Sequence, residues 1–167
     1  MQNEKKSYLE QAAAYWRGDQ PLKAGELIFE NLPTMVRPRW AGRILRLVVE
    51  RSGIQSPLLD EVLHTAEDPA TWGSAHRLFS SIRGSVLELD RLQKLHGLTK
   101  EQEVLHWVLS VAELVAKVTY NATDPPDEFD EDSGWWMASL LRSLVDYSRA
   151  DDEFPAMAWA ALCWVGD

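Results

Sequence analysis

Residues 99–122 constrain the fold of this chain more than any other segment. Thr99 followed by Gln102 three residues later is a capping-box pattern, which predicts that a helix begins at this point. Two sides of that helix are apolar, one formed by Val104, Leu105, Val108, Leu109, Ala112 and Val115, the other by Trp107, Val111, Leu114 and Val118. A helix that is apolar on two sides packs between neighbours, so we expect residues 99–122 to form the central helix of a bundle.

Seven further segments have apolar residues at helical spacing, with Ser, Asp or Pro at several starts and Gly at several ends. They cover residues 7–17, 21–32, 39–53, 56–67, 68–97, 133–147 and 151–165. No alternation of apolar and polar residues is long enough to form a strand. The sequence therefore predicts one all-α domain over residues 1–167, a bundle of about eight helices assembled in part from helical hairpins.

Residues 12–33 resemble one tetratricopeptide unit. They combine small and aromatic residues with a Gly-Asp turn at Gly18, a small residue at Ala24 and a closing Pro33. Folds of that family stack at least about three repeats, and no second copy is visible here at a period of about 34 residues. The segment is therefore interpreted as an ordinary helical hairpin.

The composition is that of a globular chain, with 46% hydrophobic and 26% charged residues. Cys163 is the only cysteine, so an intramolecular disulfide and a clustered-thiol metal site are excluded. The polar start is followed by no apolar signal region, and the longest uncharged apolar run is shorter than the roughly 20 residues that a spanning helix needs. We expect a cytoplasmic protein with no membrane association.

The net charge of −9 is unevenly distributed along the chain. Residues 1–51 carry nine basic and six acidic side chains, whereas residues 120–167 carry two basic and eleven acidic ones. The acidic third is repelled by phosphates, so nucleic acid is an unfavourable partner for it and a basic protein is a favourable one.

The acidic loop of residues 124–133 precedes the predicted seventh helix. Five of its six carboxylates lie close together in sequence: Asp127, Glu128, Asp130, Glu131 and Asp132. They lack the alternating ligands, the mid-loop glycine and the closing glutamate of an EF-hand, so calcium is not predicted. A solvated loop that steers a positively charged partner is the interpretation that we adopt.

Trp135 is the tryptophan that helix packing explains least. Five others fall on predicted core faces: Trp16, Trp40, Trp72, Trp136 and Trp159. Trp135 points away from the apolar side of its helix, on a strip that it shares with Arg142. Because an aromatic residue surrounded by charge is typical of an interface anchor, we expect Trp135, Arg142 and the acidic loop to bind a partner.

The leading functional hypothesis is a non-enzymatic helical protein-interaction module that binds a basic protein, as an adaptor, inhibitor or immunity protein would. No phosphate loop, nucleophile elbow or other catalytic motif is present. A secondary basic stripe, Arg39, Arg43 and Arg46, lies at helical spacing beside Trp40. In a protein of net charge −9, such arginines are solvated or paired internally more often than they bind nucleic acid.

Two alternatives remain open. Glu61 with His64, and Glu103 with His106, are Glu-x-x-His pairs of the kind found in di-iron carboxylate bundles, which would make the protein a metal-dependent enzyme. Helical wheels place both pairs on polar faces, so we predict no metal or cofactor. The second alternative is a homo-oligomeric structural protein, such as a homodimer, that buries the apolar segment 152–165 between copies.

Overall fold

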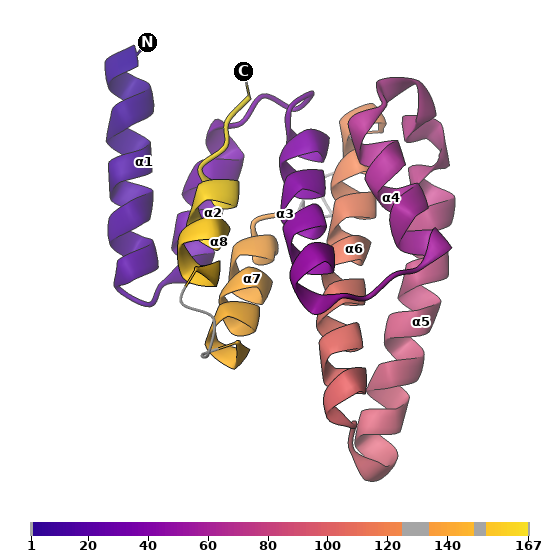
Figure 1. Cartoon of the computed structure of the whole chain (residues 1–167). Coiled ribbons are helices and arrows are strands. Elements are labelled where there is room, and N and C mark those ends of the chain that lie inside the picture. The colour runs from indigo at the N-terminus through magenta and orange to yellow at the C-terminus, as the bar shows by residue number, and fades with distance from the viewer. Residues whose placement is uncertain (1, 125–133, 149–152, 167) are drawn as a thin grey trace.

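The computed structural model describes residues 2–124, 134–148 and 153–166, with side chains from Ser7 onward (Figure 1). These residues form eight α-helices, one 3₁₀-helix and no strand. The helices are α1 (Gln2–Arg17), α2 (Pro21–Asn31), α3 (Arg37–Ser52), α4 (Pro57–Glu67), η1 (Pro69–Ser74), α5 (Ala75–His96), α6 (Lys100–Thr123), α7 (Trp136–Tyr147) and α8 (Phe154–Leu162). The prediction of an all-α bundle of about eight helices is confirmed.

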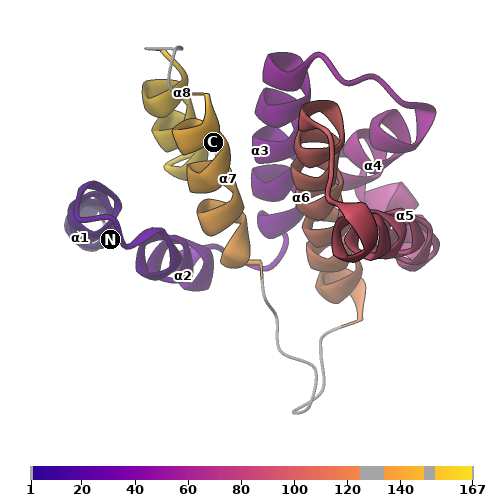
Figure 2. The same cartoon turned by 90° about the horizontal axis from the view of Figure 1, so that it is seen from below.

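Helix α6 is central, as its two apolar sides predict. The Thr99 hydroxyl accepts from the Gln102 backbone N–H at 3.2 Å, and the Gln102 side chain accepts from the Thr99 N–H at 3.0 Å, which completes the capping box. Helices α3, α4 and α5 surround α6 (Figure 2), and α7 also contacts it. Seven of its ten buried residues are hydrophobic and belong to the core cluster, so α6 supplies the middle of the core.

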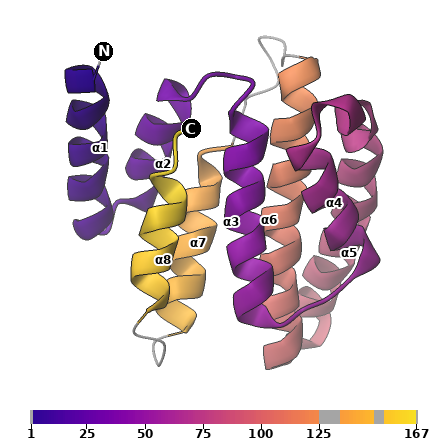
Figure 3. The same cartoon turned by 45° about the horizontal axis from the view of Figure 1, so that its top comes forward.

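The remaining helices extend the bundle sideways from α3 (Figure 3). Helix α8 packs on α3 and α7, α7 packs on α2, and α2 pairs with α1 at the edge. The indole N–H of buried Trp40 donates to the Leu162 carbonyl at 3.0 Å and so ties the end of α8 to α3. One core cluster draws side chains from all eight helices.

The predicted single helix over residues 68–97 is instead a 3₁₀-helix followed by an α-helix. Asp68 caps the start as expected, because its carboxylate accepts from the Ala70 N–H at 3.0 Å. The hydroxyls of Thr71 and Ser74 then donate to carbonyls three residues back, which favours the tighter turn. The regular α-helix begins only at Ala75.

The contact between α2 and α7 depends on a glycine. A Cβ placed on Gly25 would lie 2.7 Å from the Cβ of Ala138 and would also clash with the Trp135 carbonyl. Only a residue without a side chain allows the two backbones to approach this closely. This close approach positions the start of α7.

Among the described residues, no helix combines the length and the apolar character that crossing a lipid bilayer requires.

Candidate protein-interaction site

The start of α7 presents two tryptophans whose positions are the reverse of those predicted. Trp135 is half-buried and packs against the core, whereas Trp136, expected in the core, is 44% exposed. The N–H groups of Met137 and Ala138 bond to carbonyls three residues back, those of Gly134 and Trp135. This 3₁₀-like first turn advances by more per residue than an α-helix, so an α-helical wheel misplaces both indoles.

The two indole rings form one unit. Their centroids are 5.2 Å apart with an interplanar angle of 25°, which is a stacked arrangement. The backbone of Trp135 is held against Gly25 of α2, so the inner ring is anchored in the fold. Trp136 therefore stands on a rigid support and offers an apolar surface to solvent.

The acidic residues predicted to share this site, Asp127, Glu128, Asp130, Glu131 and Asp132, lie outside the described residues. Asp124, the last residue described before them, is exposed and accepts from the Tyr120 hydroxyl at 2.5 Å. Gly134, the next residue described, precedes Trp135 directly. The acidic sequence is thus joined by the chain to the stacked tryptophans.

Arg142, predicted to share the binding face, instead makes contacts within the molecule. It donates to the Trp16 carbonyl at 2.8 Å, and its guanidinium lies 4.9 Å from the Trp16 ring centroid. Asp19 and Asp146 form ion pairs with it at 3.4 and 3.6 Å. Arg142 fastens α7 to the end of α1, and its side chain is only 22% exposed.

The structure does not bring the two Glu-x-x-His pairs together as a metal site. Glu61 forms an ion pair with Arg77 of α5, and His64 is exposed. His106 bonds through Nε2 to Asp90 at 2.8 Å, and Glu103 is half-buried in the first turn of α6. Within the described part of the chain, no three His, Cys, Asp or Glu side chains are grouped closely enough to hold a metal ion.

The apolar eighth helix is used mainly within its own chain. Phe154, Ala158 and Leu162 are buried, and α8 packs on α3 and α7. The large apolar side chain that α8 leaves exposed is Met157, at 39%. The face of α8 that carries the three buried residues is therefore covered within the chain. The homo-oligomer alternative, which buries α8 between two copies, is not needed to cover it.

Cys163, at the end of α8, is half-buried. Burial raises the pKa of its thiol to about 12. The thiol is therefore protonated near neutral pH and is a poor nucleophile.

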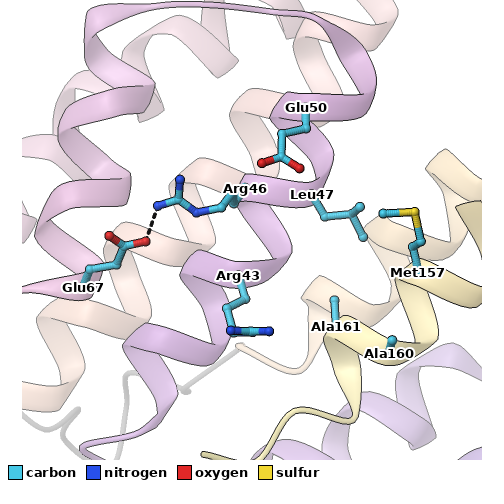
Figure 4. Close-up of a pocket in the computed structure, with 8 residues that line it drawn as sticks. All are labelled: Arg43, Arg46, Leu47, Glu50, Glu67, Met157, Ala160 and Ala161. Carbon is cyan, nitrogen blue, oxygen red and sulfur yellow. Dashed lines mark hydrogen bonds and ion pairs between the residues drawn. The ribbon is translucent and has the colours of Figure 1, made fainter.

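The three arginines of the basic stripe have different environments on α3. Arg46 forms an ion pair with Glu67 of α4, and Arg43 stacks over the Trp164 ring at 4.8 Å. Arg39 is exposed. Beside Arg43 and Arg46 lies a groove of about 350 Å³ between α3, α4 and α8 (Figure 4). This groove could not be predicted from the sequence, because its walls come from segments far apart along the chain.

No protein-family model matches the chain, and neither a curated protein nor a solved structure matches it.

Proposed function

We propose that the chain is a non-enzymatic protein-interaction module that binds a basic protein through its acidic C-terminal third, as a cytoplasmic adaptor, inhibitor or immunity protein would. The observation that carries the proposal is the exposed Trp136 stacked on the anchored Trp135. Large aromatic side chains that are rigid before binding are typical interface anchors, because little rotamer entropy is lost when a partner covers them.

The charge distribution favours a basic partner. Residues 120–167 carry eleven acidic and two basic side chains, and one of these two, Arg142, is engaged with Trp16, Asp19 and Asp146. Carboxylates around an aromatic anchor attract a positively charged surface and speed its encounter. The anchor would then supply the contact area, and the acidic residues the selectivity.

The contacts of the candidate catalytic groups support a non-enzymatic function. Glu61 is engaged by Arg77, and His106 is engaged by Asp90. The Cys163 thiol has a pKa raised to about 12. Stoichiometric iron, manganese or zinc in the purified protein would favour the metal-dependent alternative instead.

The experiment that tests the proposal is an affinity capture from the source lysate at low and high salt. We expect the wild-type chain to retain a basic protein, salt to weaken the capture, and Trp136→Ala to abolish it. Leu95→Ala is the matched control, because Leu95 is 65% exposed in the last turn of α5. Capture that Trp136→Ala leaves intact would contradict the proposed anchor.

A further inference from the structure

The groove between α3, α4 and α8 has an apolar floor and a charged rim. Leu47 of α3 and Met157, Ala160 and Ala161 of α8 form the floor, and Figure 4 shows Leu47 and Met157 facing each other across it. Met157 is 39% exposed although it is a large apolar side chain. A groove of about 350 Å³ that exposes such a floor is suited to receive an apolar side chain from a partner.

Arg43 is the charged group on the rim that is best placed to receive a ligand. Its guanidinium lies over the Trp164 ring, 4.8 Å from the ring centroid, and the Arg43 side chain is exposed to solvent. Among the described residues, no carboxylate forms an ion pair with Arg43 or with Arg39, one turn earlier on the same exposed side of α3. Two arginines without such a pair are notable in a chain with 26 acidic and 17 basic side chains.

The other charged side chains make the two ends of the groove electrostatically different. Arg46 is neutralised by its ion pair with Glu67, and Glu50 lies one turn further along α3 than Arg46. Among the lining residues, the cation without an ion pair is therefore Arg43, and Glu50 lies toward the other end. Outside the lining, the Arg51 guanidinium contacts the Met157 sulfur at 2.6 Å. A bound carboxylate is favoured at the Arg43 end, with its neighbouring apolar group over Leu47 and Met157.

We propose that this groove binds an acidic segment of a partner protein, in which a carboxylate that pairs with Arg43 lies beside an apolar side chain that covers Met157. Charge complementarity to Arg43 favours the carboxylate, and the apolar floor favours the apolar side chain beside it. A polyphosphate backbone fits less well, because it has no apolar group that could cover the floor.

This groove is distinct from the Trp135–Trp136 site and prefers the opposite charge in its partner. A chain that holds a basic protein at one surface and an acidic segment at the other is an adaptor between the two. The inference does not depend on the Trp135–Trp136 site, because no residue of that site lines the groove.

The test is a titration of the full chain with three blocked synthetic peptides, followed through the ¹⁵N-labelled indole of Trp164. The first peptide has the sequence Glu-Glu-Leu-Glu-Glu-Leu-Glu, the second has serine in place of leucine, and the third has lysine in place of glutamate. We expect the first peptide to shift the Trp164 resonance and to bind more tightly than the other two.

Three variants locate the effect in the groove. Arg43→Gln should weaken binding of the first peptide about tenfold, the loss expected for one charge-assisted pairing, without loss of folding because Arg43 is exposed. Arg91→Gln, at an exposed arginine paired with Glu88 on α5, should leave binding unchanged. Glu50→Gln should leave binding unchanged or strengthen it, because it removes a like charge.

The absence of a shift at millimolar peptide would overturn the proposal. Equal binding by the lysine peptide, or binding that Arg43→Gln does not weaken, would do the same. A molecular mass that rises with concentration in light scattering, and that Arg43→Gln returns to the monomer value, would identify a second copy of this chain as the occupant. That result would overturn the assignment to a different partner.

Discussion

Asn121 in the last turns of α6 provides a sharp test of the packing around the central helix. Its side chain is only 4% exposed, and neither Oδ1 nor Nδ2 has a hydrogen-bond partner among the described residues. A buried amide without partners costs about 1–3 kcal/mol of stability, because the hydrogen bonds that it makes to water in the unfolded chain are not replaced. Leucine has a similar size and no polar atoms, so it removes this cost.

We therefore expect Asn121→Leu to raise the free energy of unfolding by about 1–3 kcal/mol. For a chain of this size, each kcal/mol corresponds to an increase in Tm of about 2–4 °C. The measurement is urea unfolding followed by far-UV circular dichroism, supported by a thermal scan. The urea m-value should stay unchanged, because the replacement alters little of the surface exposed on unfolding.

Thr119→Val is the matched control on the same helix. Thr119 is 1% exposed, but its hydroxyl donates to the Val115 carbonyl at 2.7 Å and is therefore satisfied. Its replacement should cost about 1 kcal/mol rather than stabilise the fold. A loss of stability in Asn121→Leu would refute the reasoning, because it would mean that the amide is hydrogen-bonded in solution.

Further predictions concern two glycines, the Arg142 hydrogen bond and the Cys163 thiol. Gly25→Ala should destabilise the chain by about 1–3 kcal/mol in urea through the clash with α7, whereas Gly84→Ala, with open space around it, should stabilise α5 by about 0.5–1 kcal/mol. Arg142→Met should speed amide hydrogen exchange in α1 and leave exchange in α5 unchanged, because the bond to the Trp16 carbonyl is lost; equal exchange in α1 would count against this role. The Cys163 thiol should react with Ellman's reagent at pH 8 far more slowly than free cysteine. Since its folded pKa is raised from 9.0 to about 12, stability should fall as the pH rises between these values, and a flat urea midpoint over this range would contradict the shift.

The helices could be predicted from the sequence because their signals are local. The capping box at Thr99 marks the start of α6, and the two apolar sides of that helix require neighbours on both. Ser56 and Asp68 cap their helices through their side chains, as the Ser-Pro and Asp-Pro patterns predict. These are short-range hydrogen bonds, which do not depend on the rest of the fold.

The candidate site was predictable only in part, because its details depend on tertiary contacts and on small rotations. The sequence analysis predicted Trp135 as the anchor and placed Trp136 in the core, but in the 3₁₀-like first turn it is Trp136 that is exposed. A glycine directly before the pair, Gly134, was the available sign of a tight start. The hydrogen bond from Arg142 to the Trp16 carbonyl joins residues that are 126 positions apart in the sequence, and no periodic pattern in the sequence predicts it.

Photo-crosslinking at position 136 tests whether a basic protein contacts the Trp136 surface. The variants Trp136→p-benzoylphenylalanine and Leu95→p-benzoylphenylalanine would be irradiated in the source cells, since both positions carry exposed large apolar side chains. The proposed function predicts a covalent adduct with a basic protein from position 136 and none from position 95. No adduct at position 136, or the same adducts from both positions, would contradict the assignment of this surface as the partner-binding site.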